Sequence, residues 1–205
     1  KPTKGQIPEA LDRLCALISK AGERGAKVVV CPEMAHTGYL FRDAFHVRPF
    51  AEPARGGAFP RLSELARRYS MHLVAGYVEA ADEVLYNAAR VIAPDGELLA
   101  SYRKRLLYDS DMTWACAGDE REDAAAHTPN RHGSSDAQDA PYYPLFATPL
   151  GRMAVGICMD LNDDRFSDFL RIEQPELIAF PTNWLDQGHD IRPYWRYRLL
   201  GVSSV

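Results

Sequence analysis

Apolar residues recur at the spacing of an amphipathic helix in two segments of the chain, residues 9–21 and 61–70. Other apolar runs have the character of strands. Residues 27–31 form a β-branched run that Pro32 closes, and residues 72–78 form a second run. The first half of the chain therefore predicts helices that alternate with buried strands.

The second half adds hairpin signals to this alternation. Two strands are predicted over residues 84–104, around a turn at residues 94–96, because Asp-Gly is a strong hairpin signal. Strands that are joined both by helices and by hairpins predict an α/β protein with a mixed sheet. The remaining predicted elements are a hairpin over 144–160 that turns at 149–151, a short helix over 165–173, a strand over 176–180 and the start of a helix from about 190.

Length and composition indicate a single domain over residues 1–205. The chain is 46% apolar and 25% charged, which is ordinary for a globular protein with one packed core. Residues 117–140 differ from the rest, because they are rich in Ala, Asp, His, Ser and Gly and have almost no large apolar side chains. We expect them to form a long, flexible surface loop.

The charge and cysteine patterns argue against several classes of partner. The net charge is −4 and the isoelectric point is about 5.9, so the chain lacks the basic character of proteins that bind nucleic acid. No stretch approaches the roughly 18 apolar residues of a membrane span, and residues 1–20 lack the pattern of a signal peptide. The four cysteines show no CxxC spacing, which argues against a zinc site and predicts reduced thiols in a cytoplasmic protein.

Three predicted strands are each followed by a residue that can take part in chemistry. Glu33 follows the strand 27–31, at the edge of the sheet where α/β proteins build their sites. Lys104 ends the first hairpin, where its ammonium group can stabilise negative charge on a substrate oxygen. Cys158 lies near the end of the second hairpin and becomes a nucleophile if a neighbour takes its proton. Taken singly, the three residues also fit a helix cap, a solvated charge and an inert buried thiol.

The order of these segments resembles the nitrilase superfamily of carbon–nitrogen hydrolases. The matching segments are a Glu after Pro at 32–33, a Lys in YRKRL at 102–106 and a Cys in GICMD at 156–160. The resemblance extends over about residues 2–186. It implies a four-layer αββα sandwich, and it implies that this chain lacks the first strand and the C-terminal portion of the family domain.

The resemblance also implies a role for each of the three residues. Glu33 corresponds to the general base, Cys158 to the nucleophile and Lys104 to the stabiliser of the tetrahedral intermediate. The family has a second glutamate seven residues after the lysine, where this chain has the shorter Asp111. The implied reaction releases ammonia from an amide through a Cys thioester and requires no metal and no organic cofactor.

Four longer segments narrow the resemblance to the protein N-terminal amidases, which deamidate N-terminal Asn or Gln of proteins. They are TGYLF (37–41), HVRPFAEP (46–53), YRKRLLYDSDMTW (102–114) and GICMDLNDDRF (156–166). The implied partner is a protein N-terminus, and a carboxylate is expected near the pocket to bind its α-ammonium group. The residues that we expect to bind substrate are Tyr39, Asp109, Asp111, Trp114, Asp160, Asn183 and Trp184.

Two alternatives stay open from the sequence. The segment PTNW at 181–184 also resembles general aliphatic amidases, so a small amide is the second substrate class. A small amide requires a closed pocket, whereas a protein N-terminus requires an open cleft. The chain also fits an inactive or incomplete family member, which slow alkylation of Cys158 would indicate. Homo-oligomerisation is expected only by analogy with the fold.

Overall fold

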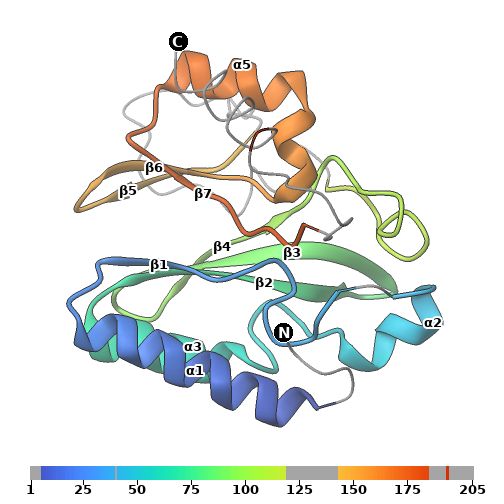
Figure 1. The fold of residues 1–205 in the computed structure, drawn as a ribbon, viewed down its shortest axis with the longest axis horizontal. Helices are drawn as coiled ribbons and strands as arrows, with labels where there is room; N and C mark the ends of the chain where they lie inside the picture. Colours follow the sequence, from blue (N-terminus) through green and yellow to red (C-terminus); the bar gives the residue numbers. More distant parts are fainter. Residues whose placement is uncertain (1–5, 40, 119–142, 185–192, 194–205) are drawn as a thin grey trace.

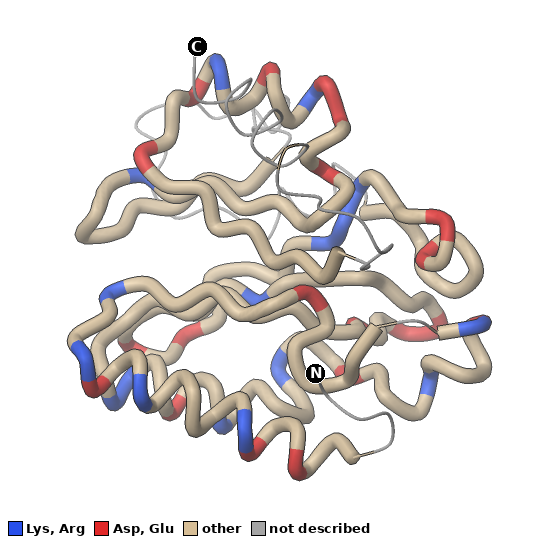
Figure 2. Tube along the Cα trace, in the orientation of Figure 1, with Lys and Arg blue, Asp and Glu red and all other residues tan. Residues whose placement is uncertain are grey.

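Four layers of secondary structure stack in the order helix, sheet, sheet, helix (Figure 1). The computed structural model describes residues 6–39, 41–118, 143–184 and 193. One outer layer contains α1 (Ile7–Glu23) and α3 (Phe59–Tyr69), and the other contains α5 (Asp164–Glu173). This arrangement confirms the expected αββα sandwich. Charged residues follow one another along α1 and α5, on the outside of the stack (Figure 2).

The first sheet joins a parallel pair to an antiparallel meander, in the order β1-β2-β3-β4. β1 pairs with β2 in parallel, and the β2–β3 and β3–β4 pairs are antiparallel. Gly96 has φ +85° in the turn between β3 and β4, a conformation that glycine adopts without steric cost. The strands are β1 (Val28–Val30), β2 (His72–Ala81), β3 (Val84–Ile92) and β4 (Leu98–Arg103).

The second sheet is shorter and has the order β5-β6-β7. The hairpin of β5 (Leu145–Thr148) and β6 (Gly151–Val155) turns where the sequence predicted. β7 (Leu177–Ala179) then pairs in parallel with β6 after the chain has passed through α5. The carboxyl ends of β6 and β7 therefore lie side by side, which brings the segments that follow them together.

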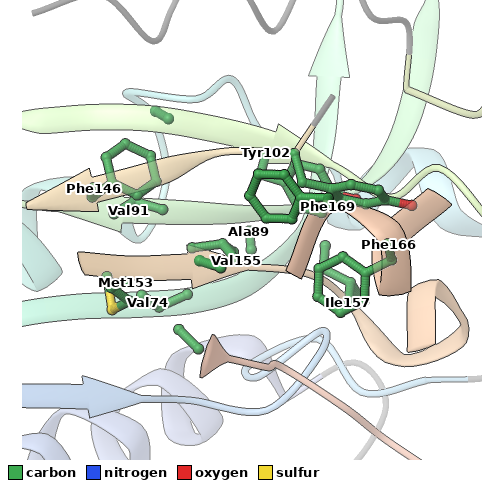
Figure 3. Close-up of a cluster of buried hydrophobic side chains, with 14 of the residues drawn as sticks. Val74, Ala89, Val91, Tyr102, Phe146, Met153, Val155, Ile157, Phe166 and Phe169 are labelled. Atoms are coloured by element: carbon green, nitrogen blue, oxygen red, sulfur yellow. The ribbon is translucent and has the colours of Figure 1, made fainter. Parts of the chain in front are cut away.

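Apolar side chains from both sheets fill the space between them (Figure 3). Val74 of β2 and alternate residues of β3 and β4 point into this layer and meet side chains from β5, β6 and α5. A second cluster joins α1 and α3 to the other face of the first sheet. The inter-sheet residues labelled in the figure are Val74, Ala89, Val91, Tyr102, Phe146, Met153, Val155, Ile157, Phe166 and Phe169.

The structure departs from the sequence prediction at three places. The predicted single mixed sheet is two stacked mixed sheets. β6 ends at Val155, and the residues up to 160 leave the sheet in a 3₁₀ turn, η3 (Cys158–Asn162). The structure also contains α2 (Ala44–Val47) and the 3₁₀ turn η1 (Arg48–Phe50), which the sequence pattern did not predict.

Most of the loop predicted at 117–140, and nearly all of the helix predicted from about 190, lie outside the described residues. Within the described ranges, no helix combines the length and apolar character that crossing a membrane requires. All four cysteines are free thiols, and Cys158 is one of the three that are buried.

Candidate active site

The three residues singled out in the sequence all follow carboxyl ends of strands. Glu33 comes after β1, Lys104 directly after β4 and Cys158 after β6. The fold brings the first two into contact, because Lys104 Nζ lies 2.8 Å from Glu33 Oε1 although 71 residues separate them. Cys158 lies close enough for the charges of Glu33 and Lys104 to act on its thiol.

Asp111 completes a buried cluster around the Lys104 ammonium group. Its Oδ2 lies 2.6 Å from Lys104 Nζ, so one cation bridges two carboxylates. Asn87 on β3 donates through Nδ2 to both acids, at 2.7 Å to Glu33 Oε1 and 3.3 Å to Asp111 Oδ2. The shorter side chain of Asp111 therefore reaches the lysine directly.

Two further donors bind Asp111 and explain how its short side chain is placed. Tyr39 donates its hydroxyl to Asp111 Oδ1 at 2.8 Å, and the backbone N–H of Tyr108 donates to Oδ2 at 3.2 Å. Asp111 also begins the turns that lead to Trp114 and Ala115, whose N–H groups bond to its carbonyl. These bonds hold the Asp111 carboxylate against the Lys104 ammonium group.

Burial makes this cluster strongly electrostatic. The exposed fraction is 1% for Glu33, 0% for Lys104 and Asp111, and 6% for Cys158, so the thiol is the most accessible of the four. Burial and the nearby Asp111 raise the pKa of Glu33, although Lys104 opposes them. Burial lowers the pKa of Lys104, but the two carboxylates outweigh it and the net shift is upward. The ammonium group therefore stays charged.

Cys158 occupies a strained position at the start of η3. Its φ of +46° lies in the left-handed region, which costs a residue with a Cβ about 1 kcal/mol or more. Its backbone N–H donates to the carbonyl of Pro181, 3.1 Å away in the segment after β7. Burial and the Glu33 charge raise the pKa of the thiol to about 12, although Lys104 and Thr182 favour the thiolate. At neutral pH the resting group is a protonated thiol.

The structure corrects the expectation that Asp160 binds the substrate. Its side chain is fully buried, and it accepts four hydrogen bonds of 2.7–3.2 Å. A carboxylate has about four acceptor sites, so none remains for an ammonium group. The donors are the Tyr102 hydroxyl and the backbone N–H groups of Ile157, Arg105 and Leu106.

The other predicted substrate-binding residues have different surroundings. Asp109 is exposed. Trp114 is buried and packs edge-on against Phe41 with ring centroids 6.0 Å apart, which favours a packing role over a pocket wall. Asn183 donates its backbone N–H to Glu33 Oε2 at 3.1 Å, and half-buried Trp184 packs against the inter-sheet core.

Sequence reasoning missed Asn87 and Gly76, which both position Glu33. A Cβ at Gly76 on β2 would lie 2.6 Å from Glu33 Cα and 2.6 Å from the Pro32 carbonyl oxygen. Only a residue without a side chain lets the Glu33 backbone lie against the strand. Its only sequence signal is a glycine inside a strand pattern, which marks close approach of another backbone.

A family model described as carbon-nitrogen hydrolase matches residues 1–200. The chain belongs to this family. The segments that carry the family resemblance contain Glu33, Lys104 and Cys158. The fold brings these segments together at the buried cluster.

Named relatives of this carbon-nitrogen hydrolase chain include a protein N-terminal amidase and an omega-amidase. The protein N-terminal amidase of Saccharomyces cerevisiae is 29% identical over 90% of this chain and 43% of its own length. The omega-amidase NIT2 of Bos taurus is 33% identical over 84% of this chain and 57% of its own length. This chain thus spans about half the length of these relatives.

Solved structures share the fold. The crystal structure of an N-terminal amidase with an Asn-Glu peptide superposes with a TM-score of 0.72, at 23% identity, over 99% of this chain and 51% of that one. An amidase from Nesterenkonia sp. superposes with a TM-score of 0.62, at 21% identity, over 92% of this chain and 64% of that one. At such identities the likeness shows the fold alone.

Proposed function

We propose that this protein is a thiol hydrolase that cleaves the C–N bond of an amide other than a peptide bond and releases ammonia. The observation that supports this most is the buried Lys104 ammonium group between two carboxylates, near a cysteine in the 3₁₀ turn that follows β6. One group can accept a proton, one can stabilise an anion and one can attack a carbonyl carbon. Its family membership supports the same reaction class.

In the first half of the reaction, Cys158 transfers its thiol proton to the Glu33 carboxylate as its sulfur bonds to the amide carbonyl carbon. The carbonyl oxygen becomes an anion, which faces the Lys104 ammonium group. The Met159 N–H, at the start of a 3₁₀ turn where backbone donors have no partner within the turn, is the second candidate donor. Glu33 then gives its proton to the leaving nitrogen, and ammonia departs.

The second half releases the acid. Glu33 takes a proton from water as the water oxygen bonds to the thioester carbon, and Lys104 again faces the oxyanion. The C–S bond then breaks, the sulfur regains a proton from Glu33, and a carboxylic acid leaves. Splitting hydrolysis through a covalent intermediate lowers each barrier.

The substrate that we propose is the side-chain amide of an N-terminal Asn or Gln. The supporting observations are the four segments of the sequence, the S. cerevisiae relative that aligns over 90% of this chain, and the structural neighbours solved with Asn-Glu and Gln-Val peptides. Exposed Asp109, five residues beyond Lys104, is the carboxylate that we propose for the substrate's α-ammonium group.

A small aliphatic amide is the second candidate substrate. The omega-amidase relatives favour it, since one of them is 33% identical over 84% of this chain. The two candidates differ in one requirement: only the first needs a free α-ammonium group next to the amide.

Ammonia release from three compounds separates these candidates. They are an Asn-starting peptide, the same peptide acetylated at its N-terminus, and a simple aliphatic amide, with Cys158→Ala as the control. The proposal predicts release from the free peptide alone and none from the variant. Release from the simple amide but neither peptide would assign the small-molecule reaction. No release from any of them would refute the hydrolase assignment.

A further inference from the structure

Asp160 joins the two halves of the site through contacts that no part of the proposed reaction uses. Its Oδ2 accepts from the Ile157 N–H at 2.8 Å, directly before Cys158. The same oxygen accepts from the Tyr102 hydroxyl at 2.7 Å, two residues before Lys104. The carboxylate thus bonds to both segments at once, although they lie more than 50 residues apart in the chain.

The other carboxylate oxygen of Asp160 strengthens the link to residues 102–106, the lysine segment. Oδ1 accepts from the backbone N–H groups of Arg105 at 3.2 Å and Leu106 at 2.9 Å. Three donors from residues just before and just after Lys104 therefore all bond to the Asp160 side chain. Backbone N–H groups and a buried hydroxyl allow little movement, because breaking such a bond leaves a buried polar group without a partner.

The turn that carries Cys158 needs such a restraint. The left-handed φ of +46° persists only if the surroundings outweigh its cost. The observed restraints on the turn are the Cys158 N–H bond to Pro181, the Asp160 N–H bond to Ile157 and the side-chain bond from Ile157 to Asp160. The last of these ties the turn to the lysine segment.

We propose that Asp160 is a positioning residue, which sets the distance between the Cys158 sulfur and the Lys104 ammonium group by linking their backbones. This inference rests on the proposed function, because the distance matters only if the two groups act on one carbonyl. A displacement of about 1 Å at a site of this kind costs roughly 100-fold in rate.

Asp160→Asn is the sharpest test, because it keeps the size of the side chain and removes one acceptor. The amide oxygen still accepts from Arg105 and Leu106, but its NH₂ group faces the Ile157 N–H and leaves that donor unpaired. The matched control is Asp163→Asn. Asp163 is also buried in this segment, and it accepts from the Tyr143 hydroxyl and from Arg165 without contacting the lysine segment.

The experiment measures kcat and KM for ammonia release, together with thermal unfolding, for both variants. Asp160→Asn should lower kcat roughly 100-fold with KM within about twofold, whereas Asp163→Asn should keep kcat within about threefold at a similar loss of melting temperature. Equal effects of the two variants on kcat would refute the positioning role, since both would then act through stability alone.

A second readout does not depend on the substrate. Iodoacetamide alkylation of Cys158 is followed at pH 8 for the wild type and both variants. If the turn loosens in Asp160→Asn, solvent reaches the thiol, its pKa falls toward the ordinary value, and alkylation becomes at least tenfold faster. Alkylation at the wild-type rate would overturn the proposal. If the wild type releases no ammonia but Asp160→Asn still alkylates at least tenfold faster than the wild type, the proposed function is refuted and the link between the two segments stands.

Discussion

Replacing Glu33 by Gln removes the proposed proton acceptor at almost constant volume. Burial and the Glu33 charge raise the pKa of the Cys158 thiol to about 12, so only a small minority of molecules carries a thiolate at pH 7. Without an acceptor, attack depends on this fraction. General bases contribute about 10²–10⁴-fold to such steps, and we expect kcat/KM to fall by about 10³–10⁴-fold. The loss of activity is smaller than the scarcity of thiolate alone would give, because removing the Glu33 charge also lowers the pKa of the Cys158 thiol.

The pH profile gives this prediction a distinctive shape. Residual activity of Glu33→Gln should rise about tenfold per pH unit between pH 7 and 9, as the thiolate fraction grows. Wild-type activity should be flat over that range and fall on acidification, when Glu33 takes up a proton. Because the pKa of Glu33 is raised by burial, this fall should begin at a higher pH than for an exposed glutamate.

Ammonia release is measured for both proteins in a coupled assay in which the ammonia-detecting enzyme is in excess. Glu79→Gln is the matched control, since Glu79 is also a buried glutamate but bonds to Ser101 and Arg103, apart from the cluster around Lys104. It should retain wild-type activity and a flat profile. Activity of Glu33→Gln within tenfold of the wild type, or a profile without the steep rise, would show that Glu33 is not the base.

Three further substitutions test the surroundings of the cluster. Lys104→Met should abolish ammonia release and destabilise the protein by about 3–5 kcal/mol in urea unfolding, because two buried carboxylates lose their cation; a loss under about 1 kcal/mol would contradict this. Gly76→Ala should cut ammonia release at least tenfold with the circular dichroism spectrum unchanged, because its Cβ displaces Glu33; wild-type activity would exclude the close approach. Tyr39→Phe should cost about 1.5–3 kcal/mol in urea unfolding, because Asp111 loses a donor, and an unchanged midpoint would show that the bond contributes nothing.

The sequence was informative wherever the signal is local. The helical spacing of 9–21 predicted α1, the β-branched run at 27–31 predicted β1, and the Asp-Gly turn predicted the β3–β4 hairpin. These elements depend on periodicity and turn chemistry, which a single segment contains. The helical turns at residues 44–50 were not predictable in this way, because they depend on packing against Phe41 and its neighbours and not on a repeated pattern.

The site was predictable only through the order of its segments. Spacing cannot show that Lys104 meets Glu33 across 71 residues, and the resemblance supplied that pairing as an expectation. It could not supply Asn87, which shares an otherwise apolar strand with Arg90. Nor could it supply the inward role of Asp160, because three of its four donors are backbone N–H groups, which leave no trace in side-chain identity. Contacts of this kind follow from how the two sheets stack.

The covalent intermediate on Cys158 is the most direct test of the account. The protein is mixed with an Asn-starting peptide, quenched in acid within a turnover, and analysed by intact mass and by peptide mapping. The account predicts an added mass equal to the peptide minus ammonia on the Cys158 fragment, absent from Cys158→Ala, which also releases no ammonia. Ammonia release by Cys158→Ala at the wild-type rate, or an adduct on another residue, would contradict it.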